Sequence, residues 1–208
     1  MDEAVNEKKM DQRSVKTRAK IISAFCAIQN DTPIEKISIS QITAKAGVSR
    51  GAFYIHFKDV QDLMGQIVDK TIEDLKEMLN VFRFSYTPLD YKRAINETVN
   101  YFFTNTSRAK FLFKREEFYV KVESLLEKVY ENVWINEANI DVSTDMWKLL
   151  IYQHNIGIIS LIGYCVFNEG KYSKKEITNA VILLDKSFDE VVLQYILNGN
   201  KQTSAEES

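Results

Sequence analysis

The chain has 208 residues, of which 45% are hydrophobic and 27% charged, with only 7 Gly and 2 Pro. These values exclude wholesale disorder and favour long helices over many strands and turns. The net charge of -2 hides an asymmetry: residues 8–58 carry ten basic and three acidic side chains, a balance of +7, so the remaining residues sum to -9. A basic N-terminal segment on an acidic body is typical of nucleic-acid binding at one end of a protein.

The extreme N-terminus is charged and lacks the apolar core of a secretory signal. Residues 1–12 show no apolar periodicity, so we expect a flexible arm, and Lys8 and Lys9 within it are candidates for contact with a phosphate backbone. A first helix is predicted from about Ser14 to Gln29. Its apolar stripe consists of Ile21, Ile22, Phe25 and Ile28.

Two short helices joined by a tight turn are predicted between Ser38 and Leu63. Ser38 and Gln41 have the spacing of a capping box, and Gly47 is a C-terminal stop because glycine adopts the left-handed conformation without strain. Ser49 then caps a second helix that opens with Arg50. A helix, a glycine-containing turn and a second helix form the helix-turn-helix pattern, whose second helix enters the DNA major groove.

The run A-G-V-S-R-G-A-F-Y-I-H-F-K-D, residues 46–59, resembles the recognition segment of TetR-family transcriptional regulators. The specific resemblance covers roughly residues 17–63, under a third of the chain. It implies an all-α fold in which a three-helix DNA-binding domain at residues 13–63 precedes a larger helical domain at residues 64–198, with a disordered tail at 199–208. The larger domain is expected to bind an effector and to form a homodimer.

The predicted DNA contacts follow from position and side-chain type. Arg50 is able to donate two hydrogen bonds to guanine, Gly51 leaves room for the backbone, and the Ala52 methyl suits a thymine methyl. The resemblance places Tyr54 on a phosphate oxygen, while His56 fits either a phosphate contact or a structural role at the helix end. The full predicted set is Ser40, Lys45, Arg50, Gly51, Ala52, Tyr54, His56 and Lys58.

One position departs from the family pattern. The family usually has F-x-x-K at the start of the next helix, with the lysine on a phosphate, whereas Val60 occupies that place here. Either Lys58 replaces this contact or the contact is absent. The helix itself is predicted to start near Asp59 and to continue to about Phe82.

Beyond Pro88 we expect amphipathic helices at about 89–106, 108–117, 118–136, 143–169 and 173–198. This region is rich in aromatic residues, most of which should be core. A subset is predicted to line an apolar effector pocket with a few polar groups. The candidates are Tyr101, Phe118, Tyr119, Trp147, Gln153 and His154. The carboxylates from Asp185 to Glu190 are interpreted as a solvated helix face.

The segment from Ile156 to Gly163 is hydrophobic all round and contains two glycines, so it must be buried on every side. Together with the apolar face of the last helix it predicts a four-helix dimer interface. The candidates are Ile156, Gly157, Ser160, Gly163, Phe188, Val192 and Tyr195. A membrane helix is the rival interpretation, but polar residues interrupt the run and it falls short of the ~18 residues that a span requires.

The sequence carries no H-E-x-x-H, C-x-x-C, G-x-G-x-x-G or P-loop motif, and its two histidines lie in different predicted domains. Cys26 and Cys165 are expected to be buried thiols. We therefore predict a non-enzymatic, cytoplasmic bacterial regulator, most simply a repressor, without a cofactor or metal. Its partners would be an operator in double-stranded DNA, a second copy of the chain and a small-molecule effector, with no membrane. The alternative is a TetR-like regulator or co-activator controlled by a protein partner, without a small ligand.

Overall fold

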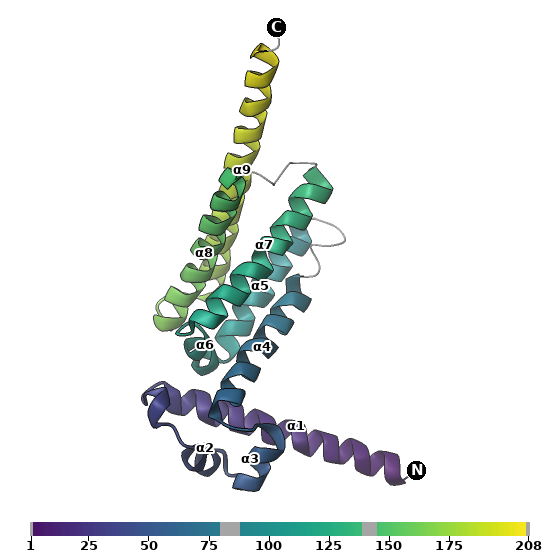
Figure 1. The fold of residues 1–208 in the computed structure, drawn as a ribbon, viewed down its shortest axis with the longest axis vertical. Helices are drawn as coiled ribbons and strands as arrows, with labels where there is room; N and C mark the ends of the chain where they lie inside the picture. Colours follow the sequence, from purple (N-terminus) through teal and green to yellow (C-terminus); the bar gives the residue numbers. More distant parts are fainter. Residues whose placement is uncertain (1, 80–87, 139–144, 207–208) are drawn as a thin grey trace. The chain divides into compact units, whose positions relative to one another are not determined.

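The computed structural model describes residues 2–79, 88–138 and 145–206, and the side chains of residues 12–79, 92–131, 145–191 and 194. Every regular element in these ranges is helical, which confirms the predicted all-α class (Figure 1). The chain divides into two compact units. Unit 1 comprises Met1–Asp74 and Asn105–Phe118, and unit 2 comprises Leu75–Thr104 and Tyr119–Ser208.

Unit 1 contains α1 (Asp2–Gln29), a 3-10 turn (Ile34–Lys36), α2 (Ile39–Ala46), α3 (Arg50–His56), most of α4 (Val60–Leu79) and α6 (Thr106–Leu112). Unit 2 contains α5 (Pro88–Thr104), α8 (Asp145–Phe167), α9 (Lys174–Glu206) and nearly all of α7 (Glu116–Ala138). The division therefore falls within α4 at residue 74, whereas the sequence analysis expected it after residue 63.

Two helices are longer than expected. The first begins at Asp2, where the sequence analysis expected a flexible arm up to residue 12 and a helix from about Ser14. The last continues to Glu206, through most of the segment expected to be a disordered tail. Residues 2–29 contain neither Gly nor Pro, so no local signal stops helix formation there, and the last residues include the good helix formers Lys201, Gln202 and Ala205.

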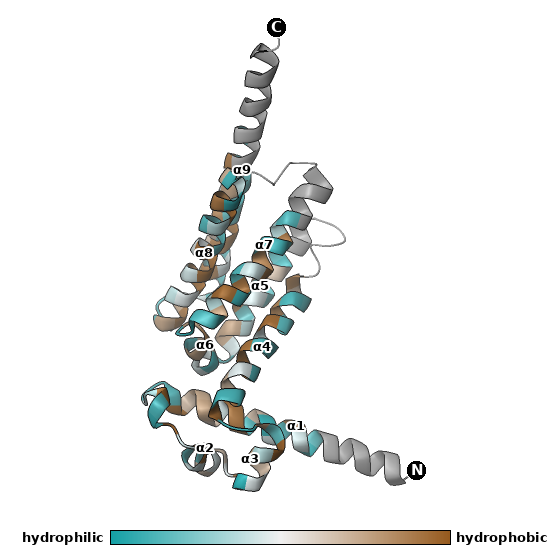
Figure 2. Cartoon of the chain, viewed as in Figure 1, coloured by the Kyte–Doolittle hydropathy of each residue, from teal (hydrophilic) through white to brown (hydrophobic). Residues whose placement is uncertain are grey.

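The core of unit 1 forms where four helices bring their apolar faces together. Phe25 of α1 and Ile42 of α2 are fully buried, as are Phe53 of α3 and Leu63 of α4. Of the apolar stripe predicted on the first helix, Ile21 and Phe25 are fully buried and Ile22 and Ile28 are half-buried. Figure 2 shows hydrophobic (brown) beside hydrophilic (teal) residues along α4. Burial raises the pKa of the Cys26 thiol to about 12, so this cysteine is a packing residue.

The segment 105–118 also belongs to unit 1, although the sequence places it among the helices of the body. Asn105 caps α6 by accepting a hydrogen bond from the Arg108 backbone at 3.0 Å. The Phe111 ring meets Phe25 of α1 edge-on, with ring centroids 5.2 Å apart. At the end of α1, the Asn30 side-chain amide donates to the Ser107 hydroxyl at 3.1 Å. These contacts attach α6 to the back of the helix that supports α2 and α3.

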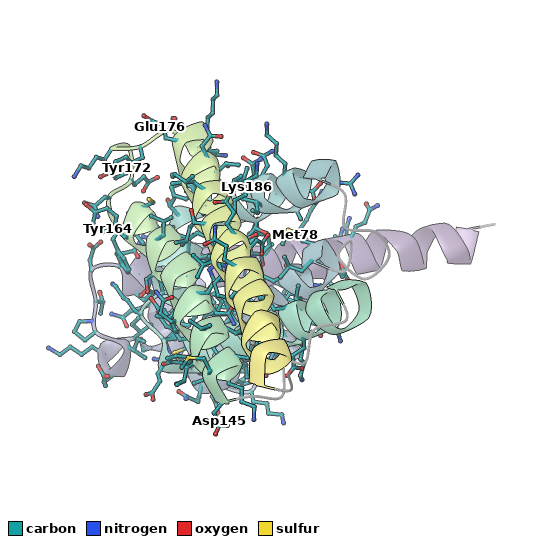
Figure 3. The ribbon with its side chains drawn as sticks, turned by 90° about the horizontal axis from the view of Figure 1, so that it is seen from above. Met78, Asp145, Tyr164, Tyr172, Glu176 and Lys186 are labelled. Carbon is teal, nitrogen blue, oxygen red and sulfur yellow. The ribbon has the colours of Figure 1, made fainter. Side chains whose placement is uncertain are left out.

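In unit 2, α8 and α9 lie side by side and run in opposite directions, with Asp145 and Glu176 at opposite ends of the pair (Figure 3). Ser173 and Glu176 form a capping box at the start of α9, in which the Ser173 backbone donates to the Glu176 carboxylate at 2.8 Å. A short connection with Gly170 at φ 85 reverses the chain between the helices.

Helix α8 is long and apolar enough, by length and composition alone, to cross a membrane, and 44% of its most apolar window is buried inside the structure. That single helix is weak support for a membrane span, because core helices of globular proteins pass the same test. Its buried face includes His154 and Asn155, two polar residues that a lipid-facing segment would rarely carry.

The Gly47 backbone yields a direct test of the turn between α2 and α3. Gly47 has φ 64, so Gly47→Ala should lower the free energy of unfolding by about 1–2 kcal/mol although open space surrounds the added methyl. Gly65 in α4 is the matched control: it is helical and equally unobstructed, so Gly65→Ala should be neutral or stabilise by up to about 1 kcal/mol. Urea unfolding of both variants measures the difference, and equal effects would contradict the assigned turn.

Candidate nucleic-acid interface

Local hydrogen bonds fix the two helices of the predicted reading head. The capping box is present as expected: the Ser38 backbone donates to the Gln41 side chain at 2.8 Å, and the Gln41 backbone donates to the Ser38 hydroxyl. Gly47 ends α2 in the left-handed conformation. Ser49 then accepts a hydrogen bond from the Ala52 backbone at 3.1 Å and starts α3. These elements confirm the helix-turn-helix geometry that the motif predicts.

Two phenylalanines hold α3 against the core of unit 1. Phe53 and Phe57 are 0% and 1% exposed, and their rings lie 5.6 Å apart. The Arg18 guanidinium of α1 lies over the Phe57 ring at 5.5 Å. Because Phe53 of α3 and Phe57, directly after it, hold one side of this seven-residue helix in the core, its other side is left facing outward.

The outward side of α3 and the adjoining turns carry most of the predicted DNA contacts. Tyr54 is half exposed, at 52%, although it is an aromatic residue. The other predicted contacts that are exposed in the structure are Ser40, Lys45, Arg50, Gly51 and Lys58. Hydroxyl, ammonium and guanidinium groups of this kind donate to phosphate oxygens and guanine edges. The structure thus brings these residues of α2, α3 and the following turn together on one small domain.

Ala52 and His56 are only half-buried, in contrast to the exposed residues around them. Desolvation lowers the pKa of His56, and the positive charge of Arg18 lowers it further. Both effects favour the neutral imidazole, which keeps one N–H donor. Both predicted roles of His56, a phosphate contact and a structural role at the helix end, therefore remain open.

At the start of α4, Val60 occupies the position where the family pattern has a lysine. Val60 is the first residue of the helix and is half-buried. Asp59 caps α4 by accepting from the Asp62 backbone at 2.8 Å, and Asp62 in turn accepts from the Lys58 backbone at 2.8 Å. The hydrogen bond from the Lys58 backbone, together with one from Gln66, lowers the pKa of the Asp62 carboxyl. The Lys58 side chain stays exposed beside the position where the family places its lysine.

Sequence reasoning missed a network that links three helices behind α3. The Gln66 amide of α4 accepts from Arg18 of α1 at 3.0 Å and donates to the His56 carbonyl at the end of α3 at 3.3 Å. It also donates to Asp62 at 3.2 Å. In the sequence, the only sign of this network was Arg18, a charged residue on a helix whose predicted packing stripe is apolar. The network fixes the C-terminal end of the reading helix.

Ile55 is a second residue that sequence reasoning missed. It lies on α3 next to Tyr54 and is 78% exposed. The sequence analysis named its neighbours Tyr54 and His56 as candidate contacts but not Ile55. An exposed aliphatic group on this helix is suited to contact with a thymine methyl.

The predicted effector-binding residues do not form one group. Phe118 is fully buried against Phe113, with rings 5.4 Å apart, and belongs to unit 1. In unit 2, Trp147 and His154 are buried, whereas Gln153 is exposed. Tyr101 and Tyr119 are half-buried, and burial raises the pKa of Tyr119.

The predicted dimer residues are likewise divided. Ser160 is exposed, and Ile156 and Gly157 are half-buried. Gly163 is buried within the protomer, and Phe188 stacks on the buried His154 ring at 4.1 Å, so both face the interior of unit 2. The side chains of Val192 and Tyr195 lie outside the described residues.

A different set of apolar side chains on α8 and α9 is exposed. Five of them recur at helical spacing along one side of α8 and two lie on α9, and all are 46% to 67% exposed. The set consists of Met146, Leu149, Tyr152, Tyr164, Phe167, Leu183 and Val191. We call it the exposed apolar stripe.

Comparison with known proteins places this geometry in a family. The family described as bacterial regulatory proteins, tetR family, matches residues 21–67. The HTH-type transcriptional regulator AcrR of Shigella flexneri is 30% identical over 90 residues, which is 42% of this chain and 42% of that protein. The chain thus aligns with under half the length of this relative.

Two solved structures extend the likeness to the whole fold. The structure of SmeT, described as the repressor of the Stenotrophomonas maltophilia multidrug efflux pump SmeDEF, has a TM-score of 0.60 at 14% identity, covering 83% of this chain and 91% of SmeT. The dihydroxyacetone kinase operon activator DhaS has a TM-score of 0.56 at 18% identity, covering 83% and 96%. At these identities the likeness concerns the fold. The matched helix-turn-helix, the related regulator and the shared fold together support the interpretation of this chain as a TetR-family transcriptional regulator.

Proposed function

We propose that this regulator is a cytoplasmic repressor that binds an operator as a homodimer and releases it when a small molecule binds unit 2. The observation that carries the DNA-binding part is the division of α3 into two sides. Phe53 and Phe57 are buried in the core, while Arg50 and Tyr54 remain exposed on a domain with an excess of basic residues. Repression as the sign of regulation is supported by the likeness to SmeT, and DhaS, named an activator, shows the opposite sign on a similar fold.

The exposed apolar stripe supports the homodimer. Large apolar side chains that recur along one helix face are typical of an interface with another protein surface. A two-fold pairing through α8 and α9 would cover the stripe on both copies at once, because the same surface meets itself across a two-fold axis. It would also present two copies of α3 to half-sites about one helical turn apart. The stripe replaces Gly163 and Phe188, which face inward, as the centre of the proposed interface.

Substitutions in α3 test the proposed reading of DNA. Arg50→Ala should weaken operator binding by about 1–3 kcal/mol and relax the preference at one base pair. Tyr54→Phe should weaken binding to all sequences alike, because a phosphate contact carries no base information. Fluorescence anisotropy on a panel of single-base operator variants at fixed salt separates the two effects. An Arg50→Ala protein that keeps the full wild-type preference at every base pair would contradict the base-reading role.

The dimer is tested by sedimentation at micromolar concentration. The wild-type chain, at 24.1 kDa per protomer, should sediment as a dimer. Leu149→Arg should yield monomers, because it places a charge in the middle of the proposed dry interface. Val120→Arg is the matched control, since Val120 is 61% exposed against 64% for Leu149 but lies on α7 away from the stripe. A wild-type monomer, or dimers of both variants, would refute this interface.

A further inference from the structure

A buried polar cluster joins three helices inside unit 2. His154 of α8 and Asp185 of α9 are 2% and 3% exposed, and the His154 Nε2 atom lies 2.8 Å from the Asp185 Oδ1 atom. The Tyr130 hydroxyl of α7 lies 2.8 Å from the same Nε2 and donates a hydrogen bond to the same Oδ1. Asp185, predicted to lie on a solvated face, is thus part of the interior.

This cluster is a poor way to stabilise a helical bundle. Taking a carboxylate out of water costs several kcal/mol, and apolar residues of similar volume commonly do as well or better at such positions. Most of the side chains that α8 buries around it are apolar, among them Trp147, Ile151, Ile159 and Ile162. Both hydrogen bonds that reach Asp185 end on Oδ1, which leaves Oδ2 as an acceptor for a further donor.

Aromatic rings pack against His154, whose imidazole lies 2.8 Å from this carboxylate. The Phe188 ring stacks on His154, with centroids 4.1 Å apart and planes inclined by 15°. Tyr130 meets Phe188 at 6.1 Å and Trp147 meets it at 6.3 Å. The negative faces of such rings attract a cation, and the attraction strengthens where water is excluded.

Two further buried polar side chains near the cluster have no hydrogen-bond partner within the described residues. Asn155, next to His154 in the sequence, is 0% exposed, and neither its Oδ1 nor its Nδ2 is bonded. The Thr178 hydroxyl, two helical turns before Asp185 on the same side of α9, is also unbonded. A buried threonine commonly donates to its own helix, as Thr71 does to the Ile67 carbonyl at 2.9 Å. Unsatisfied groups of this kind are typical of a site that awaits a ligand or ordered water.

We propose that Asp185, with Tyr130, His154 and Phe188, forms the polar end of the effector site and selects a protonated lipophilic amine. The ammonium donates to Asp185 Oδ2 and lies against the aromatic rings, while the apolar part of the ligand occupies the interior of the bundle. Asn155 and Thr178 supply hydrogen bonds to polar substituents. An anionic ligand of the same shape is repelled by the buried carboxylate. The inference rests on the proposed control by a small molecule and names the chemical class of that molecule.

Three probes that share one ring system test this selectivity on the full-length protein. Calorimetric titration with 1-naphthylmethylamine, 1-naphthalenemethanol and 1-naphthoic acid varies only the polar group. A hydrogen bond to a charged group makes a difference of about tenfold or more, so the amine should bind at least that much more tightly than the alcohol, and the acid should bind most weakly. The wild-type series needs no substitution, so it decides the matter even where a variant fails to fold.

Two substitutions then assign the selectivity to one carboxylate. Asp185→Asn should abolish the advantage of the amine over the alcohol, because it removes the negative charge that selects the ammonium. Glu190→Gln is the matched control: it removes the same charge from the same helix at an exposed position and should keep the wild-type preference. Equal loss of preference in both variants, or an unchanged preference in a folded Asp185→Asn protein, overturns the proposal.

Operator binding, measured separately by anisotropy, distinguishes this inference from the proposed function. If the alcohol or the acid binds as tightly as the amine, or if no probe binds while the protein holds its operator, the assignment of a cation-selective site is wrong and the DNA-binding function stands. If the acid binds and releases DNA, control by a small molecule stands and the class named here is refuted. If the protein binds no DNA, the proposed function fails whatever the probes do.

Discussion

The burial of Phe53 and Phe57 is the constraint on which the DNA-binding unit depends. A seven-residue helix is too short to be stable by its own hydrogen bonds. It persists because two aromatic side chains on one side are held in the core formed by α1, α2 and α4. The same packing determines which residues face outward, so the stability of α3 and the display of Arg50 and Tyr54 have one cause. A substitution that loosens either phenylalanine would therefore alter DNA binding without touching DNA.

Hydrogen bonds, in addition to this packing, fix the orientation of α3 and hold α6 against α1. Gln66 connects α4 to the carbonyl at the end of α3 and to Arg18 of α1, so the orientation of the reading helix is tied to two of its supports. On the far side of α1, Asn30 and Phe25 hold α6 through Ser107 and Phe111. Unit 1 thus includes a segment that the chain reaches only after passing through α5 of unit 2. The chain passes between the two units three times, once within α4 and once on either side of the segment 105–118.

Local signals explain what was predictable from sequence. The capping box at Ser38, the left-handed glycine at Gly47 and the cap at Ser49 act over three or four residues, so α2 and α3 were placed nearly to the residue. Long-range packing explains the rest. Nothing in the sequence around Asn105 or Phe118 indicates attachment to α1. From the sequence alone Asp185 was interpreted as solvated, because its contacts with α7 and α8 appear only in the folded structure. His154 was singled out for its residue type alone, whereas its partners Tyr130 and Asp185 required the fold.

The central claim is that two copies of the exposed side of α3 read DNA together. The most direct test is selection of bound sequences from a random pool of duplexes by the full-length protein. The account predicts enrichment of one short motif repeated in inverted orientation, with the two half-sites centred about one helical turn apart. Recovery of a single unrepeated motif, or of no motif above the background of the pool, would contradict it.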